Sequence, residues 1–350
     1  MMGLTTTAVT NVRAIAGRAG LRLFRALDPR PMILMYHRVE ELPTDPQLLA
    51  VQPRHFAEHL EVLRRSFRVL SLGELVEALS RGRFPRHAVV LTIDDGYADN
   101  LANAKPLLES FGTPATVFVT TGSIGSEREF WWDELERLVL HPGRLPQKLR
   151  LSIRGRSHDW DLGDGASYSA DDFERQKSWH VEQPSDPGPR QSLYRSLYSH
   201  LHPLSHDEKG SILAELARQA EIGVVGRPTH RPLTHQELSR LEGGVVEIGA
   251  HTVTHPTLAA LSPEAQRDEI QGSKATLEAE LGRPIVAFAY PHGSYTAATV
   301  ATVREAGYQY ACTSDARLVT RASDPLLLPR LVPRNWDGRT FERWLRSWLG

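Results

Sequence analysis

The sequence lacks the features that mark several classes of protein. Cys312 is the only cysteine among 350 residues, so the chain can form neither an internal disulfide nor a thiolate-bound metal site. It contains no run of about 18 apolar residues, which excludes a membrane-spanning helix. Lys and Arg number 41 against 42 Asp and Glu, so the basic excess typical of nucleic-acid-binding proteins is missing and we expect no nucleic-acid partner. Hydrophobic residues at 41% and charged residues at 24% indicate an ordinary globular protein.

The amino-terminal region also lacks the uninterrupted apolar core of a secretory signal peptide. Residues 1–30 carry five arginines and one aspartate, and their apolar side chains fall on one face of a helix. We therefore expect a basic amphipathic helix at 1–30. It either packs on the protein or rests on an anionic membrane surface through residues 9–27. We expect the protein in the cytoplasm, and the alternative is a peripheral position at the inner face of the membrane.

Short apolar runs alternate with helix-like segments along most of the chain. Such runs are typical of strands buried on both faces, as in a parallel sheet. The alternation indicates βα units, and the length of the chain suits one barrel. We therefore predict an α/β barrel built from residues 31–124 and 232–350. Its expected strands lie at 32–36, 88–93, 115–120, 245–250, 285–290 and 308–313.

The alternation fails between residues 125 and 231. The stretch 140–190 is rich in Gly, Pro, Asp and Ser. Helix signals return at Leu193, which begins an apolar i, i+4 series, and at Ser205, where Glu208 completes a capping box. We interpret 125–231 as a largely helical insertion on the barrel, serving either as a lid or as a surface for a partner.

Polar residues stand directly after three of the apolar runs. They are His37, the pair Asp94 and Asp95, and His251. In βα barrels the chemistry gathers at the carboxyl ends of the strands, so these side chains can meet although they are far apart in sequence. Neighbouring strand residues point to opposite faces, so both carboxylates serve one site only if the chain turns there, which Gly96 permits.

A carboxylate with two histidines predicts a metal site. The segment His251-Thr-Val-Thr-His255 leaves a strand, whereas the other i, i+4 histidine pairs lie in helix-like segments, where we interpret them as solvent-facing. Those pairs are His55 with His59 and His202 with His206. One carboxylate and two imidazoles form a three-ligand set with an open position, which is typical of catalytic metals. The second carboxylate stays free for proton transfer.

At these residues the chain resembles the polysaccharide deacetylase family, which has the NodB-homology fold and is similar to carbohydrate esterase family 4. The resemblance covers approximately residues 31–121 and 245–334. Its motifs are Met35-Tyr-His-Arg-Val39, Leu91-Thr-Ile-Asp-Asp-Gly-Tyr97, His251-Thr-Val-Thr-His255 and Phe288-Ala-Tyr-Pro-His-Gly293. The resemblance implies a distorted (β/α) barrel of about seven parallel strands. It also implies one divalent metal ion, commonly zinc, with cobalt, nickel or iron(II) as alternatives.

The resemblance also implies roles for particular residues. Asp94 matches the general base of the family, and its metal ligands match Asp95, His251 and His255. His37 matches the general acid of those members whose motif order is circularly permuted, in which this histidine comes early.

One departure concerns an arginine that many members carry close to the base. The corresponding position here is Ala289. Either Arg330 or Arg334 supplies the missing charge instead, and the alternative is that both are ordinary surface arginines. We expect the backbone N–H of His292 at the oxyanion, with Tyr290 and Arg330 as further candidates for contacts with the oxyanion or substrate.

The resulting hypothesis is a metal-dependent hydrolase that removes N-acetyl groups from a sugar in a polysaccharide or glycan intermediate, as in exopolysaccharide biosynthesis. The alternative within hydrolases is a deformylase or another hydrolase of non-peptide C–N bonds. The alternative from another class is a non-catalytic glycan-binding or assembly protein. Four tryptophans either stack on sugar rings or pack in the core. They are Trp131, Trp132, Trp160 and Trp179.

Overall fold

The computed structural model describes residues 30–223 and 225–349. The amphipathic helix expected at 1–30 lies outside the described residues, apart from Arg30. That helix and its membrane contact through 9–27 therefore stay predictions. Among the described helices, none is both long and apolar enough to cross a lipid bilayer.

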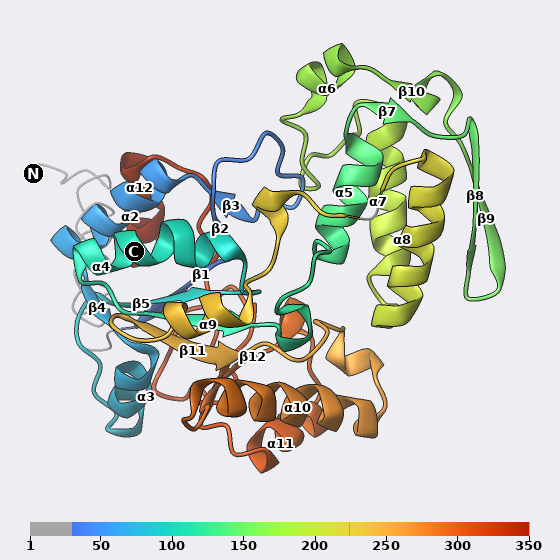
Figure 1. Cartoon of the computed structure of the whole chain (residues 1–350). Coiled ribbons are helices and arrows are strands. Elements are labelled where there is room, and N and C mark those ends of the chain that lie inside the picture. Colours follow the sequence, from blue (N-terminus) through green and yellow to red (C-terminus); the bar gives the residue numbers. More distant parts are fainter. Residues whose placement is uncertain (1–29, 224, 350) are drawn as a thin grey trace, which may run out of the picture.

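A parallel sheet of seven strands forms the centre of the molecule (Figure 1). Six strands lie side by side in the order β1 (Met32–Tyr36), β5 (Ala88–Ile93), β6 (Ala115–Val119), β11 (Val246–Ala250), β12 (Ala287–Ala289) and β13 (Tyr310–Cys312). The seventh, β4 (Arg68–Leu70), pairs with the first half of β5. All of these pairings are parallel. The predicted distorted (β/α) barrel is confirmed, and only β4, whose first residue is exposed, escaped the search for apolar runs.

An extended segment, residues 326–331, runs between the first and last strands of this series. Leu328 bridges to β13 and Leu331 to β1, both in parallel. Leu331 accepts a backbone hydrogen bond from Met35 and donates one to Ile33, each 2.8 Å long. The segment therefore closes the seam of the barrel and carries its own side chains into the interior.

Helices cover the outside of the sheet. They are α2 (Pro53–Ser66), α3 (Leu72–Ser80), α4 (Lys105–Phe111), α9 (His235–Leu241), α10 (Pro263–Leu281), α11 (Ala297–Glu305) and α12 (Gly338–Leu349). Ser71 forms a capping box with Glu74 at the start of α3, and Ser262 caps α10 with Pro263 in its first turn. Apolar faces of α2, α9 and α10 pack on the strands in one large core.

The chain from α5 (Trp131–Leu140) to α8 (His206–Ala220) forms a lobe beside the barrel (Figure 1). Its other helices are α6 (Ala170–Gln176) and α7 (Pro189–Leu201). Leu135, Leu193 and Leu213 belong to an apolar core of its own. The helix signals near Leu193 and at Ser205 are confirmed.

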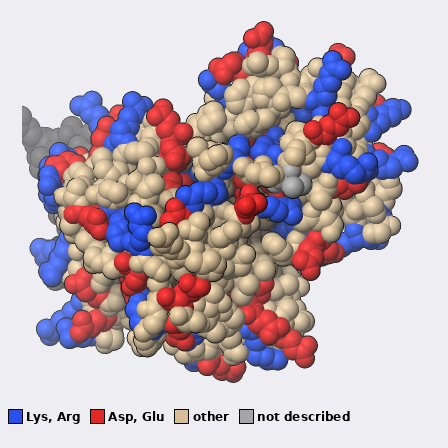
Figure 2. Space-filling view, in the orientation of Figure 1, with Lys and Arg blue, Asp and Glu red and all other residues tan. Residues whose placement is uncertain are grey.

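Short strands accompany these helices. β8 (Lys148–Ile153) and β9 (Arg156–Asp161) form an antiparallel hairpin that the sequence search did not predict. β7 (Gly143–Arg144) pairs with β10 (Ser167–Tyr168), and outside the lobe β2 (Arg38–Val39) pairs with β3 (Ala50–Val51). In the view of Figure 2, basic and acidic side chains are interspersed over both the barrel and the lobe.

Candidate active site

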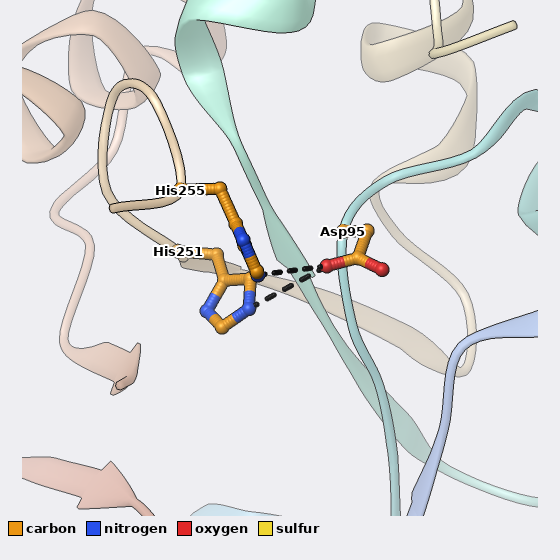
Figure 3. Close-up of side chains that lie close together, drawn as sticks. All are labelled: Asp95, His251 and His255. Atoms are coloured by element: carbon orange, nitrogen blue, oxygen red, sulfur yellow. Dashed lines mark ion pairs between the residues drawn. The ribbon is translucent and has the colours of Figure 1, made fainter. Parts of the chain in front are cut away.

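Three buried side chains from two loops converge at the carboxyl end of the sheet (Figure 3). Asp95 follows β5, while His251 and His255 belong to the loop after β11. Oδ1 of Asp95 lies 3.3 Å from Nε2 of His255 and 3.6 Å from Nε2 of His251. The structure thus brings together the three residues that the sequence proposed as metal ligands, although 156 positions separate Asp95 from His251.

Strained backbone aims these side chains at one point. Asp95 has φ 77° and Gly96 has φ 84°, so the chain turns sharply as soon as β5 ends. A Cβ on Gly96 would lie 3.0 Å from Cγ1 of Val119, which also favours glycine there. In the second loop, Thr252 and His255 have φ of 67° and 56°. Positive φ is costly for such residues and is typical of functional sites.

The donor set fits a divalent metal. Oδ1 of Asp95 is buried and has no hydrogen-bond partner within residues 30–223 and 225–349. Nδ1 of His251 lies 2.8 Å from the carbonyl oxygen of Ala289, to which its N–H donates, so Nε2 keeps its lone pair toward Asp95. Ligand atoms about 2.0–2.2 Å from a tetrahedral zinc ion stand roughly 3.3–3.6 Å apart. The distances from Oδ1 of Asp95 to the two imidazole nitrogens fall in this range.

Burial sets the protonation tendencies of this cluster. Burial lowers the pKa of His255 well below its usual value, and nearby His251 and Lys209 add to that effect, so His255 is a neutral imidazole. Burial raises the pKa of Asp95, because an isolated carboxylate is poorly stabilised away from water. A cation held by the two imidazoles and the carboxylate would remove this cost.

The second carboxylate, Asp94, is held by Arg330. The guanidinium Nη1 and Nη2 each donate to one carboxylate oxygen at 2.7 Å, and both side chains are buried. Burial by itself raises the pKa of Asp94, but Arg330 and His251 lower it to about 2. Asp94 is therefore ionised at neutral pH and stands beside the ligand cluster, its Oδ2 3.9 Å from Nε2 of His251.

The geometry separates the two arginines that were candidates to replace the one missing at Ala289. Arg330 reaches Asp94 because residues 326–331 enter the barrel interior, where its Nε also donates to the carbonyl of Thr313 at 2.9 Å. Arg334 instead donates to the carbonyl of Leu48 and pairs with Glu182. Arg330 therefore holds the carboxylate of Asp94, the candidate base, and is itself fully buried.

A pocket with about 450 Å³ of empty space, partly open to solvent, lies in front of the cluster. His37 lines it together with Asp94 and Asp95. Burial lowers the pKa of His37, although the two carboxylates act in the opposite direction. The structure therefore places the candidate acid and the candidate base in one pocket.

The two candidates in the fourth motif differ in position. His292 lines the pocket, and its ring centre is 4.5 Å from that of His255. It adopts φ 56° within the helical turn Pro291–Gly293. Tyr290 points the other way, into the apolar core, and its hydroxyl donates to the carbonyl of Leu326 at 3.1 Å. The structure brings His292 to the site but leaves the Tyr290 side chain outside the pocket.

Residues of the lobe complete the pocket. Trp132 of α5 and Tyr198 of α7 line it. Trp132 is one of the tryptophans that the sequence offers for stacking on sugar, whereas no sequence signal pointed to Tyr198. The Trp132 ring centre is 4.9 Å from that of His255, and its Nε1 donates to the Tyr97 hydroxyl at 2.8 Å. Of the four tryptophans considered for sugar stacking, Trp132 lines the pocket, whereas Trp160 and Trp179 pack in the apolar core of the lobe.

Two histidines that the sequence predicts to face solvent, His59 and His202, are covered by other elements. His59 is fully buried, with Nε2 2.8 Å from the carbonyl of Trp336. His202, at the end of α7, has its ring centre 4.3 Å from that of His292. Both lie on helix faces that another element covers, which spacing within one helix does not reveal.

The family model described as polysaccharide deacetylase matches residues 81–143 and 211–311. Over these 164 of its 350 residues, the chain matches the polysaccharide deacetylase family. Three of the four motifs fall in the matched residues, whereas the motif that contains His37 precedes them. The catalytic and metal-binding roles given to the site residues stay predictions.

Two curated relatives are similar to parts of the chain, and one solved structure is similar to its fold. A putative polysaccharide deacetylase of Bacillus subtilis, YxkH, is 30% identical over 111 residues, 31% of this chain and 38% of that protein. The poly-beta-1,6-N-acetyl-D-glucosamine N-deacetylase of Escherichia coli K12 is 33% identical over 92 residues, 26% of this chain and 14% of that protein. The chain thus matches well under half the length of either relative.

The similar solved structure is the Streptococcus pyogenes deacetylase PplD in complex with acetate. It superposes with a TM-score of 0.56 and 19% identity, over 92% of this chain and 99% of that one. This similarity supports the deacetylase fold assigned above.

Proposed function

We propose that this protein hydrolyses the N-acetyl amide of a hexosamine in a polysaccharide or glycan intermediate. The observation that carries the proposal is Asp94, an ionised carboxylate clamped by Arg330 next to the cluster of Asp95, His251 and His255. A non-catalytic glycan-binding protein would have no need to bury a spare carboxylate beside a complete ligand set. The N-acetylglucosamine polymer named for the Escherichia coli relative supports the choice of substrate class.

Asp95, His251 and His255 would hold the divalent ion, for which zinc is our first choice and cobalt, nickel or iron(II) the alternatives. When bound, such an ion supplies Lewis-acid polarisation to the acetyl carbonyl and to the attacking water.

The protein's own residues handle the protons. Asp94 accepts a proton from the water as its oxygen bonds to the acetyl carbon, and Arg330 keeps the carboxylate ionised and oriented. The backbone N–H of His292 donates toward the oxygen that becomes negative. His37 then donates a proton to the amine nitrogen as the C–N bond breaks, which releases acetate and the free amino sugar.

Mass spectrometry of N-acetylglucosamine oligomers incubated with the zinc-loaded protein tests this proposal. We expect loss of acetyl groups and release of acetate, abolished by a chelator and restored by zinc. The same oligomers carrying N-formyl groups measure the preference between acyl groups, and faster release of formate would favour a deformylase. Asp94→Asn is the matched inactive control. Metal binding without release of either acid would contradict a hydrolytic function.

A further inference from the structure

A second cavity adjoins the catalytic pocket on the side of the lobe. It encloses about 620 Å³ of empty space, part of it open to solvent, between α5, α8 and the loop after β11. Trp132 and His255 line both this cavity and the catalytic pocket. A glycan whose N-acetyl group reaches the ligand cluster therefore has room for a neighbouring residue or substituent here.

Lys209 of α8 lines this cavity and is only 3% exposed. Its ammonium lies 4.9 Å above the ring centre of Trp131, and among the described residues it has no hydrogen-bond acceptor and no ion-pair partner. A lysine ammonium carries three donors, and a buried charge is costly unless it is paired. The ring contact offsets part of that cost and satisfies none of the three donors.

The indole N–H of Trp131 is a second donor at the cavity. Its Nε1 is buried and has no hydrogen-bond partner among the described residues, and Trp131 lines the same cavity. Buried donors in folded proteins nearly always have acceptors, so this exception requires an explanation, whereas the Lys209 ammonium still reaches the solvent of the open cavity. An acceptor-rich ligand that enters the cavity would replace that water at Lys209 and supply an acceptor to Trp131.

The acidic residues around this cavity already have partners. Glu134 accepts from Arg128 at 2.8 Å, and Glu129 accepts from Arg227 at 2.8 Å. Each of these ion pairs is neutral as a whole. The charge that remains uncompensated in the cavity is the positive charge of Lys209.

Two further carboxylates lie close enough to Lys209 to favour its charged form, but each forms its hydrogen bonds with other groups. Glu208 closes the capping box of α8 with Ser205. Glu269 accepts backbone hydrogen bonds from Val253 and Thr254, each 2.8 Å long. Neither forms an ion pair with the Lys209 ammonium.

We propose that this cavity binds an anionic group of the glycan through Lys209 and the indole N–H of Trp131. The group is a carboxylate of a uronic acid or a phosphate attached to the sugar, since both offer several charged acceptor oxygens to a point cation. The proposal rests on the proposed deacetylase function, because it places the anion next to the sugar that loses its acetyl group. It makes Lys209 a determinant of substrate choice, with no part in the bond-breaking step.

Three oligosaccharides of equal length provide the test. One alternates N-acetylglucosamine with glucuronic acid, one contains N-acetylglucosamine alone, and one is the neutral oligomer with a phosphate at its reducing end. We expect the zinc-loaded protein to have a lower KM for at least one anionic substrate than for the neutral one. The anion that gives the lower KM identifies the source of the charge.

Variants assign the effect to Lys209. Lys209→Met should raise the KM for the preferred anionic substrate about tenfold or more, the loss expected for a hydrogen bond to a charged group, and leave turnover of the neutral oligomer unchanged. Lys209→Arg should retain most of the preference. Lys148→Met, which removes an exposed lysine from the same lobe, should behave as the unmodified protein. Thermal unfolding of each variant confirms that the fold is kept.

The possible failures are distinguishable. If acetate is released but the KM values do not distinguish anionic from neutral substrates, or Lys209→Met matches Lys148→Met on all three, the anion site is wrong and the deacetylase function stands. If no substrate releases acetate, calorimetric binding of the two anionic oligosaccharides to the unmodified protein and to Lys209→Met decides. Equal or absent binding would then overturn the anion site as well.

Discussion

Arg330 donates to both carboxylate oxygens of Asp94 at 2.7 Å, across 236 positions of sequence and inside the closed barrel. The pair lies immediately beside the ligand cluster but contributes no atom to it. The candidate base is thus fixed by a residue outside the motifs that identify the site.

Removing the charge of Arg330 should destabilise the protein markedly. Arg330→Met leaves Asp94 buried without its partner, and breaking a buried pair in this way costs about 3–5 kcal/mol. Arg334→Met, which removes a partly exposed arginine from the same stretch of chain, should cost about 1 kcal/mol or less. Urea unfolding measures both free energies. Equal losses in the two variants would contradict the role given to Arg330.

Loss of a metal ligand should abolish stoichiometric zinc binding. Asp95→Ala removes the oxygen that faces both imidazoles, so we expect less than one zinc ion for each chain after dialysis, measured by elemental analysis. Asp94→Asn is the matched control at the neighbouring position and should retain the ion. If Asp95→Ala keeps its zinc, the ion binds somewhere other than this cluster.

The proton-transfer residues should affect the rate while zinc is retained. Asp94→Asn and His37→Ala should each lower kcat for deacetylation by about 10²–10⁴, the usual contribution of a general acid or base. Steady-state kinetics on a zinc-loaded sample checks this, with the metal content determined in parallel. A His37→Ala variant with full activity would remove His37 from the mechanism and leave Asp94 in place.

Stability should fall as the pH is lowered through the range in which His59 titrates only in the unfolded chain. Burial is the main cause that lowers the pKa of folded His59 to about 4, from about 6.5 when unfolded. Between those values the unfolded chain binds the extra proton, so stability decreases with falling pH by roughly 3 kcal/mol in total.

His59→Gln should remove that part of the pH dependence, which denaturant unfolding at a series of pH values measures. His55→Gln, one turn earlier on α2, is the matched control. An unchanged pH dependence in His59→Gln would show that other groups cause the loss of stability.

The sequence predicted the barrel and the ligand cluster because their signals are local. An apolar run that ends in a charged residue, such as the one before Asp94, identifies both a buried strand and its functional end. Capping boxes such as that of Ser71 and Glu74 fix helix starts within one turn. The ligand positions follow, since the carboxyl ends of parallel strands lie at one edge.

The missed features depend on contacts between distant segments. Trp132 and Tyr198 reach the pocket only through the way in which the lobe packs against the barrel, and no spacing within α5 or α7 encodes that packing. The buried position of His59 results from α12, whose Phe341 ring stacks on it at 3.9 Å between ring centres. The β8–β9 hairpin was missed although β8 alternates buried and exposed residues, because polar residues dominate β9.

Residues 326–331, which close the seam of the barrel, are made late during synthesis of the chain, and this affects the site. A ribosome-bound chain that has not yet produced residues 326–331 already contains the three ligand residues but cannot pair Asp94, since Arg330 and the last bridge between β13 and β1 arrive together. Truncation just before this segment should therefore yield an open sheet with an unneutralised carboxylate at its centre. Closure of the barrel and pairing of the buried Asp94 carboxylate therefore depend on the same segment.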